Sequence, residues 1–278
     1  MGYVRTMDRF KDMIKMLDIE NRKKQIVEKY GLEPTVTFFY YLWNAIDYVG
    51  RANVKESFES ISGLGDEVIV GDYSSNDGTK ELAEECGLKV ISVEKTPGIT
   101  FHESKIINKA IYNSKSNFVV DLDCHTVYPK NLTEIIKKNL LRKDITKDQL
   151  VLRGLYRGYN GRERIEFSHC SSCILYKPYL LEVGGLDERT YYGFGTTFYM
   201  LGILEDIYKL EMNNIYVGNM VHRFHMHLKI PRWANIFDIT IDNTLENDMF
   251  SRFQATNCLK PLRQNFDEGR KTVKNSYW

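Results

Sequence analysis

The stretch SNFVVDLDCHTVYP, residues 116–129, is a short apolar run that ends in two aspartates one residue apart. An apolar run bounded by polar residues is typical of a buried strand. Because side chains alternate along a strand, Asp121 and Asp123 are expected on one face of its end, with Leu122 on the other. Two carboxylates this close resist joint ionisation unless a cation lies beside them. The pattern therefore indicates a site for a divalent metal, and oxygen ligands favour Mg²⁺ or Mn²⁺. The structural alternative is an acid pair that makes only turn and cap hydrogen bonds.

Working outward from this stretch, strands alternate with helices of about ten residues, which predicts an α/β fold with a mostly parallel sheet covered by helices. In such sheets, ligands bind outside the carboxyl ends of the strands, where Asp72 also follows an apolar run. The expected strands are TVTFFYYLW (35–43), Val68–Val70 within DEVIVGD (66–72), LKVISVEK (88–95) and NFVVDLD (117–123). The expected helices are ANVKESFESISGLG (52–65), KELAEECG (80–87) and FHESKIINKAIYNSKS (101–116).

The flanking parts of the chain are read from the same periodicities. Residues 3–31 have amphipathic helical spacing that Gly31 and Pro34 should end. Beyond residue 129 we expect a helix at 131–141, a strand at 149–156 and a helix around LEDIYKLEM (204–212). No internal repeat or linker is visible, so we expect a helical extension at 1–33 and a single domain over 34–278.

Composition excludes several classes of protein. Of 278 residues, 43% are hydrophobic, enough for a sizeable core, and 38 Lys and Arg balance 37 Asp and Glu, which argues against a nucleic-acid partner. No apolar run approaches the roughly 20 residues of a membrane helix, and the N-terminus lacks the apolar core of a signal peptide, so we expect a soluble cytoplasmic protein. Five scattered cysteines argue against a disulfide framework, and the lone pair Cys170 and Cys173 favours free thiols over a zinc site.

The segment GDYSSNDGT (71–79) is a second candidate for ligand binding. Asp72 ends a strand, and a turn rich in small polar residues leads into a helix. Such a turn can hold the base and ribose of a nucleotide, and the free amides at a helix N-terminus favour anions. Asp77, Gly78 and Thr79 equally suit an ordinary turn and helix start.

The order of these segments resembles the GT-A fold glycosyltransferases, in particular family 2 and the related galactosyltransferase and chondroitin-synthase type domains. The segments are DYSSNDGT, FHESKIINKAI, FVVDLDCHTVYP, GGLDE, LEDIYKLEMNNIYV and a late histidine, and they span roughly residues 35–227. The resemblance implies transfer of a sugar from a nucleoside diphosphate sugar, UDP by the family's habit, to a saccharide or other hydroxyl acceptor. It also implies Mn²⁺ or Mg²⁺ dependence. Residues 34–128 would form the nucleotide-sugar half, and 129–278 the acceptor-binding and catalytic half. Association with a membrane partner or a polymerase complex stays open.

The resemblance also implies roles for individual residues of the first half. Asp121 and Asp123 would hold the metal and border the ribose and diphosphate. Asp72 would contact the base, and Asp77 lies in the same nucleotide-binding turn.

Further along, Lys105 and Asn108 match the K..N pattern of the galactosyltransferase-like helix near the donor. Ile107 stands where family 2 enzymes often carry an arginine, which leaves the donor phosphate contacts in question.

Catalysis is assigned by the same resemblance to the second half. An inverting transfer needs a carboxylate that takes the proton of the acceptor hydroxyl. Glu205 and Asp206 match the family's ED pair, although the spacing after GGLDE is longer than usual. Asp206 ranks slightly above Glu205, with Asp187 in reserve. Acids favoured at a helix N-terminus by the helix dipole are the structural alternative.

A late histidine completes the metal shell in the similar enzymes, which points to His222 or His225; spacing cannot rank the two, and a purely structural histidine cluster is the alternative. Two rival functions also stay open. One is a sugar nucleotidyltransferase, although no glycine-rich basic loop follows the first strand. The other is a catalytically silent saccharide-binding or scaffold domain, which the missing arginine favours and the costly acid pair opposes.

Overall fold

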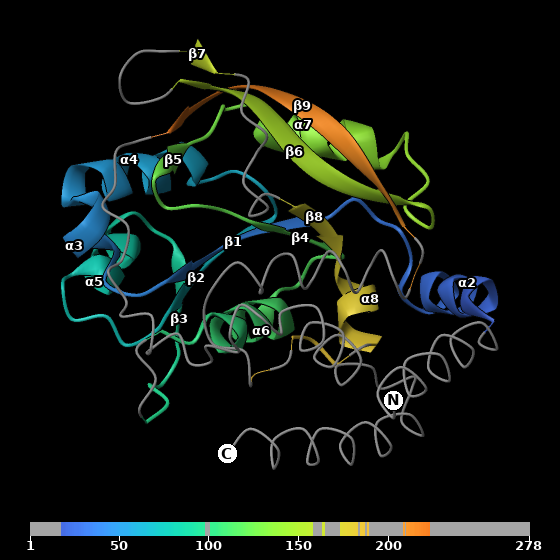
Figure 1. Cartoon of the computed structure of the whole chain (residues 1–278), viewed down its shortest axis with the longest axis horizontal. Coiled ribbons are helices and arrows are strands. Elements are labelled where there is room, and N and C mark those ends of the chain that lie inside the picture. Colours follow the sequence, from blue (N-terminus) through green and yellow to red (C-terminus); the bar gives the residue numbers. More distant parts are fainter. Residues whose placement is uncertain are drawn as a thin grey trace, which may run out of the picture.

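The computed structural model describes residues 18–97, 101–157, 163–164, 173–182, 184–186, 188, 208 and 210–222. Within these ranges one sheet has the strand order β3-β2-β1-β4-β8-β6-β9-β5, and β7 pairs with β6 (Figure 1). Its strands are β1 (Val36–Leu42), β2 (Glu67–Asp72), β3 (Lys89–Ser92), β4 (Phe118–Asp121), β5 (Thr126–Val127), β6 (Asp148–Arg157), β7 (Glu163–Arg164), β8 (Cys173–Tyr176) and β9 (Glu211–His222). The helices are α2 (Ile19–Tyr30), α3 (Ala45–Val49), α4 (Arg51–Ile61), α5 (Thr79–Glu85), α6 (Glu103–Asn113), α7 (Leu132–Leu140) and α8 (Lys177–Glu182).

Strands β3, β2, β1 and β4 form a parallel block. β1 pairs in parallel with both β2 and β4, with Leu42 opposite Asp72 and Phe39 opposite Asp121. β2 pairs in parallel with β3. Since the carboxyl ends of parallel strands meet at one edge, Asp72 and Asp121 lie at the same edge of the sheet, with β1 between them.

Helices pack on both faces of β1, as its continuous apolar sequence requires. Tyr40 meets Phe58 of α4 edge to face, with ring centroids 5.2 Å apart. The next residue, Tyr41, points to the other face and packs in a cluster with Ile106 of α6. α6 approaches β2 so closely that a Cβ on Gly71 would lie 2.4 Å from Cγ2 of Ile106, so only glycine fits there.

The second part of the sheet reverses direction. β8 runs antiparallel to β4 and β6, while the long strands β6 and β9 run parallel to each other. β5 then pairs antiparallel with β9, which sets Thr126 opposite His222. Most paired residues lie in parallel ladders, and the predicted α/β class with a mostly parallel sheet is confirmed.

Several details differ from the sequence predictions. β4 ends at Asp121, so Asp123 lies in the following turn, where Thr126 N–H donates to the Asp123 carbonyl. The helix expected over 204–212 is wrong at its end, because Glu211 starts β9. β5, β8 and β9 were not predicted at all. Each is specified by pairing with a distant segment, which local periodicity does not report.

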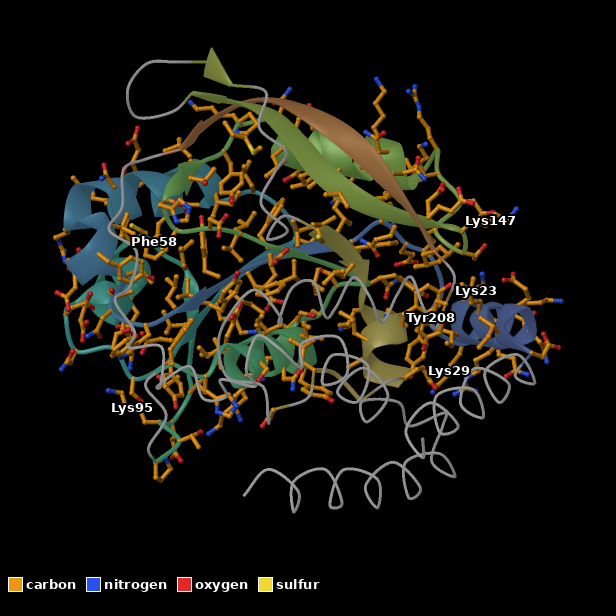
Figure 2. The ribbon with its side chains drawn as sticks, in the orientation of Figure 1. Lys23, Lys29, Phe58, Lys95, Lys147 and Tyr208 are labelled. Carbon is orange, nitrogen blue, oxygen red and sulfur yellow. The ribbon has the colours of Figure 1, made fainter. Side chains whose placement is uncertain are left out.

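Helix α2 begins after Asp18, whose carboxylate accepts a hydrogen bond from the Asn21 N–H, and it ends before Gly31, as predicted. Lys23 of α2 donates to the Thr146 carbonyl, and Tyr208 stacks on Tyr179 of α8, with ring centroids 4.3 Å apart. Figure 2 labels Lys23 and Tyr208. The division into an extension at 1–33 and a domain at 34–278 stays a prediction. Within the described ranges, no helix is both long and apolar enough to cross a membrane.

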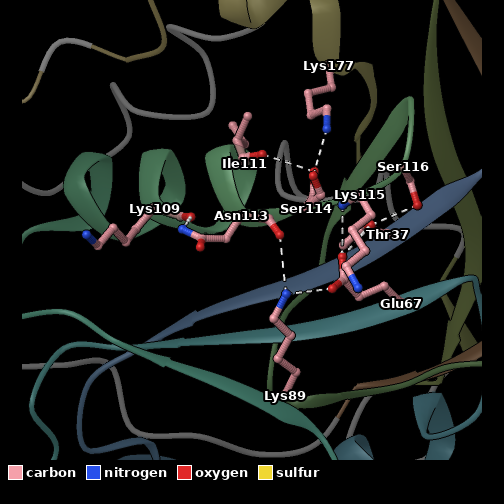
Figure 3. A network of polar contacts seen from close by, with 10 residues as sticks. All are labelled: Thr37, Glu67, Lys89, Lys109, Ile111, Asn113, Ser114, Lys115, Ser116 and Lys177. Atoms are coloured by element: carbon pink, nitrogen blue, oxygen red, sulfur yellow. Dashed lines mark hydrogen bonds and ion pairs between the residues drawn. The ribbon is translucent and has the colours of Figure 1, made fainter.

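A polar network occupies the amino edge of the parallel block (Figure 3). Glu67 accepts hydrogen bonds from Lys89 Nζ, from the Lys115 N–H and from the Thr37 hydroxyl. Nearby, Lys177 Nζ donates to the Ser114 carbonyl. Burial by itself would raise the pKa of Glu67, but the bonds from Lys89 and Lys115 outweigh it and lower that pKa. The network joins β1, β2 and β3 to the chain between α6 and β4.

Candidate metal and nucleotide site

Asp121, the last residue of β4, carries a buried carboxyl group with one oxygen available. Its Oδ1 accepts a 2.9 Å hydrogen bond from the Cys173 N–H of β8, while Oδ2 has no hydrogen-bond partner among the described residues. Burial raises the pKa of Asp121 to about 8; the Cys173 bond opposes this, and the charges of Asp123 and Glu103 add to it. At neutral pH the group therefore holds its proton unless a cation compensates its charge.

Asp123 lies two residues further on, half-buried, at the start of a tight turn. Its N–H donates to the Tyr128 hydroxyl at 2.9 Å. The turn is also held from α4, where the Ser57 hydroxyl donates to the Thr126 carbonyl at 2.7 Å. Ser60 in the same helix accepts a bond from the Tyr128 N–H. The backbone beside Asp123 is therefore fixed from two directions.

Sequence reasoning missed Ser57, Ser60 and Tyr128 as supports of this turn. A serine on an amphipathic helix gives no signal in the sequence that it binds a distant turn. The helix also precedes the turn by more than sixty residues. Tyr128 was part of the stretch that indicates the metal site, and a tyrosine closing a turn after an acid pair was the one local signal available.

The chemistry of the donor set fits a hard divalent cation. Asp121 Oδ2 and the Asp123 carboxylate are oxygen ligands, and the former is buried without a partner from the described part of the chain. Among the described residues, no three or more His, Cys, Asp or Glu side chains are grouped so that they could hold a metal ion. Mg²⁺ and Mn²⁺ suit such a site, because they keep several positions for water and phosphate oxygens.

Of the two candidate histidines, the structure describes only the backbone of His222. The pairing of β5 with β9 sets the backbone of His222 opposite Thr126, three residues after Asp123. His225 lies outside the described residues. The sheet thus brings the backbone of His222 to the turn that begins at Asp123.

Asp72 ends β2 and is 1% exposed. Its Oδ2 accepts a 3.2 Å bond from the Ser75 N–H, and Oδ1 has no hydrogen-bond partner within the described ranges. Burial raises the pKa of Asp72, against the opposing effects of the Ser75 hydrogen bonds and the Lys80 charge. Like Asp121, it offers one buried oxygen at the carboxyl edge.

Asp77 acts as a turn and helix-start residue. Its Oδ1 accepts from the Thr79 N–H at the start of α5, and its Oδ2 accepts from the Asp47 N–H in α3. The carboxylate thereby joins the connections that follow β1 and β2. A contact from Asp77 to a nucleotide stays a prediction.

Lys105 and Asn108, on α6, contact neighbouring protein segments. Lys105 Nζ donates to the Glu94 carbonyl at 3.0 Å. Asn108 is buried; its Nδ2 donates to the Leu186 carbonyl and to Glu188 Oε1, and its Oδ1 accepts from the Leu186 N–H at 2.7 Å. Asn108 thus links the GGLDE segment to α6. Its predicted proximity to the nucleotide-sugar donor stays a prediction.

His102 strengthens the same junction. One ring nitrogen lies 2.9 Å from the Thr96 hydroxyl, and the other lies 2.7 Å from the Glu188 carbonyl. Burial lowers the pKa of His102, although its bond to Glu188 opposes this. The neutral imidazole therefore links the connection after β3 to the GGLDE segment.

The predicted catalytic acids Glu205 and Asp206, and the reserve Asp187, lie outside the described residues. Cys170 lies outside them too. Cys124 and Cys173 are buried, Cys86 is half-buried, and none of the three forms a disulfide within the described ranges. Cys173 serves the site through its backbone N–H.

No family model matches the chain, and no curated protein matches it significantly in sequence. Solved structures do match in fold. Glucosyl-3-phosphoglycerate synthase from Mycobacterium tuberculosis, in complex with Mn²⁺ and UDP-glucose, superposes with a TM-score of 0.55 at 17% identity, over 82% of each chain. The same protein with Mn²⁺, UDP and glucosyl-3-phosphoglycerate gives 0.54 at 17% identity, over 80% of this chain and 82% of that one. A mycobacterial protein gives 0.53 at 17% identity, over 82% and 78%. The sheet order and these likenesses together show that the chain has the GT-A glycosyltransferase fold.

Proposed function

We propose that this protein is a metal-dependent glycosyltransferase that takes its sugar from a nucleoside diphosphate sugar. The observation that carries the proposal is the buried oxygen Oδ2 of Asp121, which has no hydrogen-bond partner in the described part of the chain and lies beside Asp123 in sequence. In a GT-A sheet, this carboxyl edge is where a bound metal would meet a diphosphate. An acid pair kept there without a cation would be destabilising.

Each residue of the site has a proposed task. Asp121 and Asp123 hold Mn²⁺ or Mg²⁺, with His222 or His225 as a further ligand. When bound, the metal neutralises the charge that develops on the departing diphosphate. Asp72 accepts a hydrogen bond from the nucleoside. Asp206, or else Glu205 or Asp187, takes the proton of the acceptor hydroxyl in an inverting transfer.

UDP is the proposed nucleotide and a saccharide, or another hydroxyl compound, the proposed acceptor. Support for UDP comes from the solved complexes of similar fold, which contain Mn²⁺ with UDP or UDP-glucose. The phosphoglycerate found in that synthase belongs to that protein.

The test is calorimetric titration of UDP and GDP, each with and without Mn²⁺. The proteins are the parent chain, Asp123→Asn and the control Glu59→Gln, which alters an exposed acid paired with Lys55 on α4. We expect Mn²⁺-dependent binding of UDP by the parent and the control, and at least tenfold weaker binding by Asp123→Asn. Metal-dependent hydrolysis of UDP-glucose by the parent would then show catalysis.

Two results would overturn the proposal. Failure of the parent to bind either nucleotide with any divalent metal would reject the roles of Asp121 and Asp123 and favour a silent saccharide-binding or scaffold domain. Binding that is equally strong in Asp123→Asn would place the nucleotide elsewhere on the molecule.

A further inference from the structure

The loops that follow β1 and β2 are joined by hydrogen bonds between three polar residues, here called the Asn44–Ser75–Asn76 latch. The Asn44 N–H donates to Ser75 Oγ at 2.9 Å. The side chain of Asn44 donates through Nδ2 to Asn76 Oδ1 at 2.8 Å, and its Oδ1 accepts from the Asn76 N–H at 2.9 Å. One asparagine thus satisfies groups of the facing loop in both directions.

Both loops carry backbone strain at this point. Asn44 has φ 48° and Ser74 has φ 49°, and within the described ranges they alone among non-glycine residues have positive φ. The left-handed conformation is costly for residues with a side chain and persists where the surroundings hold it in place. Asn44 is held by the latch, and the Ser74 hydroxyl donates to the Val93 carbonyl at 3.1 Å. Both strained residues lie in the loops beside Asp72.

The latch reaches Asp72 through Ser75. The Ser75 N–H donates to Asp72 Oδ2 at 3.2 Å, and contacts with Ser75 lower the pKa of Asp72 against the effect of burial. Because Ser75 Oγ accepts the Asn44 N–H, the loop after β1 holds the residue whose backbone N–H binds Asp72. The Ser75 N–H engages Oδ2 of the carboxylate, while Oδ1, buried and without a hydrogen-bond partner in the described part of the chain, is left for another donor.

We propose that Asn44, Ser75 and Asn76 are positioning residues that hold Oδ1 of Asp72 in place for an N–H or O–H of the donor's nucleoside. The inference rests on the proposed function and extends it to three residues that themselves need not touch the nucleotide.

The experiment compares two ligands that separate the halves of the site. UDP with Mn²⁺ uses both the nucleoside contact and the metal, whereas pyrophosphate with Mn²⁺ uses the metal side only. The variants are Ser75→Ala and Asn76→Ala, with the conservative Ser75→Thr and Asn76→Asp, which retain the hydroxyl and the accepting Oδ1 respectively. Asn113→Ala is the matched control, because Asn113 is an exposed asparagine with one side-chain bond at the C-terminal end of α6. Thermal unfolding of each variant checks that it folds.

We expect each alanine variant to weaken the binding of UDP with Mn²⁺ by about five- to tenfold, the effect of one or two lost hydrogen bonds. Pyrophosphate should bind all variants within twofold of the parent. Ser75→Thr and Asn76→Asp should restore UDP binding to within about threefold. Asn113→Ala should change neither ligand.

The inference is overturned if both alanine variants bind UDP as the parent does, or if they lose UDP and pyrophosphate equally, which would mean a general loss of structure. It is also overturned if the conservative variants fold but fail to restore UDP binding. A parent chain that binds no UDP overturns the proposed function itself, and with it the latch, so the two failures are told apart by the parent's titration.

Discussion

The N–H of Cys173 in β8 donates a 2.9 Å hydrogen bond to Oδ1 of Asp121 at the end of β4. Strand β8, which follows β4 by about fifty residues, therefore sets the orientation of a carboxyl group that belongs to the predicted acid pair. The antiparallel pairing that ends with Val120 opposite Ile174 brings the two residues together. One oxygen is engaged by the backbone, and the other is directed away from that contact.

Replacing Asp121 by asparagine should separate its structural role from its metal role. Asparagine retains an oxygen for the Cys173 N–H and removes a buried acid. We therefore expect the Tm of the metal-free variant to be no more than about 2 °C below that of the parent. The stabilisation by Mn²⁺ with UDP should be lost. Differential scanning fluorimetry measures both. Asp121→Ala is the contrast, because it leaves the Cys173 N–H without its acceptor and should lose about 1–3 kcal/mol. A full ligand-induced shift in Asp121→Asn would contradict the metal role.

Tyr128→Phe should weaken the site while keeping the fold. The change removes only the hydroxyl that accepts the Asp123 N–H, and the buried ring still packs. We expect a loss of about 1 kcal/mol in unfolding free energy and about fivefold weaker binding of Mn²⁺ with UDP. Denaturant unfolding and calorimetry measure these values. Tyr176→Phe is the control, since its hydroxyl bonds the Gly31 carbonyl at the far end of the sheet. Equal losses of affinity in both variants would count against a positioning role of Tyr128.

Asn108→Ala should destabilise the junction between α6 and the GGLDE segment. Asn108 makes three hydrogen bonds to Leu186 and Glu188 and is 4% exposed, so alanine leaves a buried N–H and carbonyl without partners. We expect a loss of about 2–4 kcal/mol in urea unfolding. The exposed asparagine of the same helix provides the comparison, and Asn113→Ala should lose no more than about 0.5 kcal/mol. Similar losses in the two variants would mean that the three bonds contribute little.

Glu67→Gln tests the network at the amino edge through its dependence on pH. Although burial opposes ionisation, the bonds from Lys89 and Lys115 lower the pKa of Glu67, so its charge stabilises the folded state above the unfolded pKa. That stabilisation is lost as pH falls through the folded-state pKa. We expect Glu67→Gln to be less stable than the parent by about 1–2 kcal/mol at pH 7. The difference should shrink below the unfolded pKa of about 4.3 and vanish once pH lies below the folded-state pKa. Unfolding curves from pH 7 to pH 3 measure it. A difference that persists unchanged at pH 3 would show that packing, rather than charge, is responsible.

Local patterns were enough to predict the first part of the fold. The strands that became β1, β2, β3 and β4 and the helices that became α4, α5 and α6 follow one another at the predicted places. Each is specified by hydrophobic periodicity over a short window and by glycine or polar residues at its ends. The placement of Asp72 and Asp121 at strand ends follows from the same patterns.

The supports of these acids could not be predicted in the same way. Ser57, Asn44 and the Cys173 N–H act on residues that are remote in sequence, and neither their residue type nor their spacing indicates a partner. The contacts of Lys105 and Asn108 could not be predicted either, because matching a motif does not reveal which neighbouring segment a side chain contacts.

By itself the sequence therefore determined the alternation of strands and helices, the parallel block and the acids at its carboxyl edge. Those features depend on interactions between residues close along the chain, and on the rule that parallel strands end at one edge. Tertiary structure alone decided that β8 orients Asp121, that β9 brings His222 opposite Thr126, and that the loops after β1 and β2 join beside Asp72. These contacts form between segments far apart in sequence, where register and side-chain direction are set by the packing of the whole sheet.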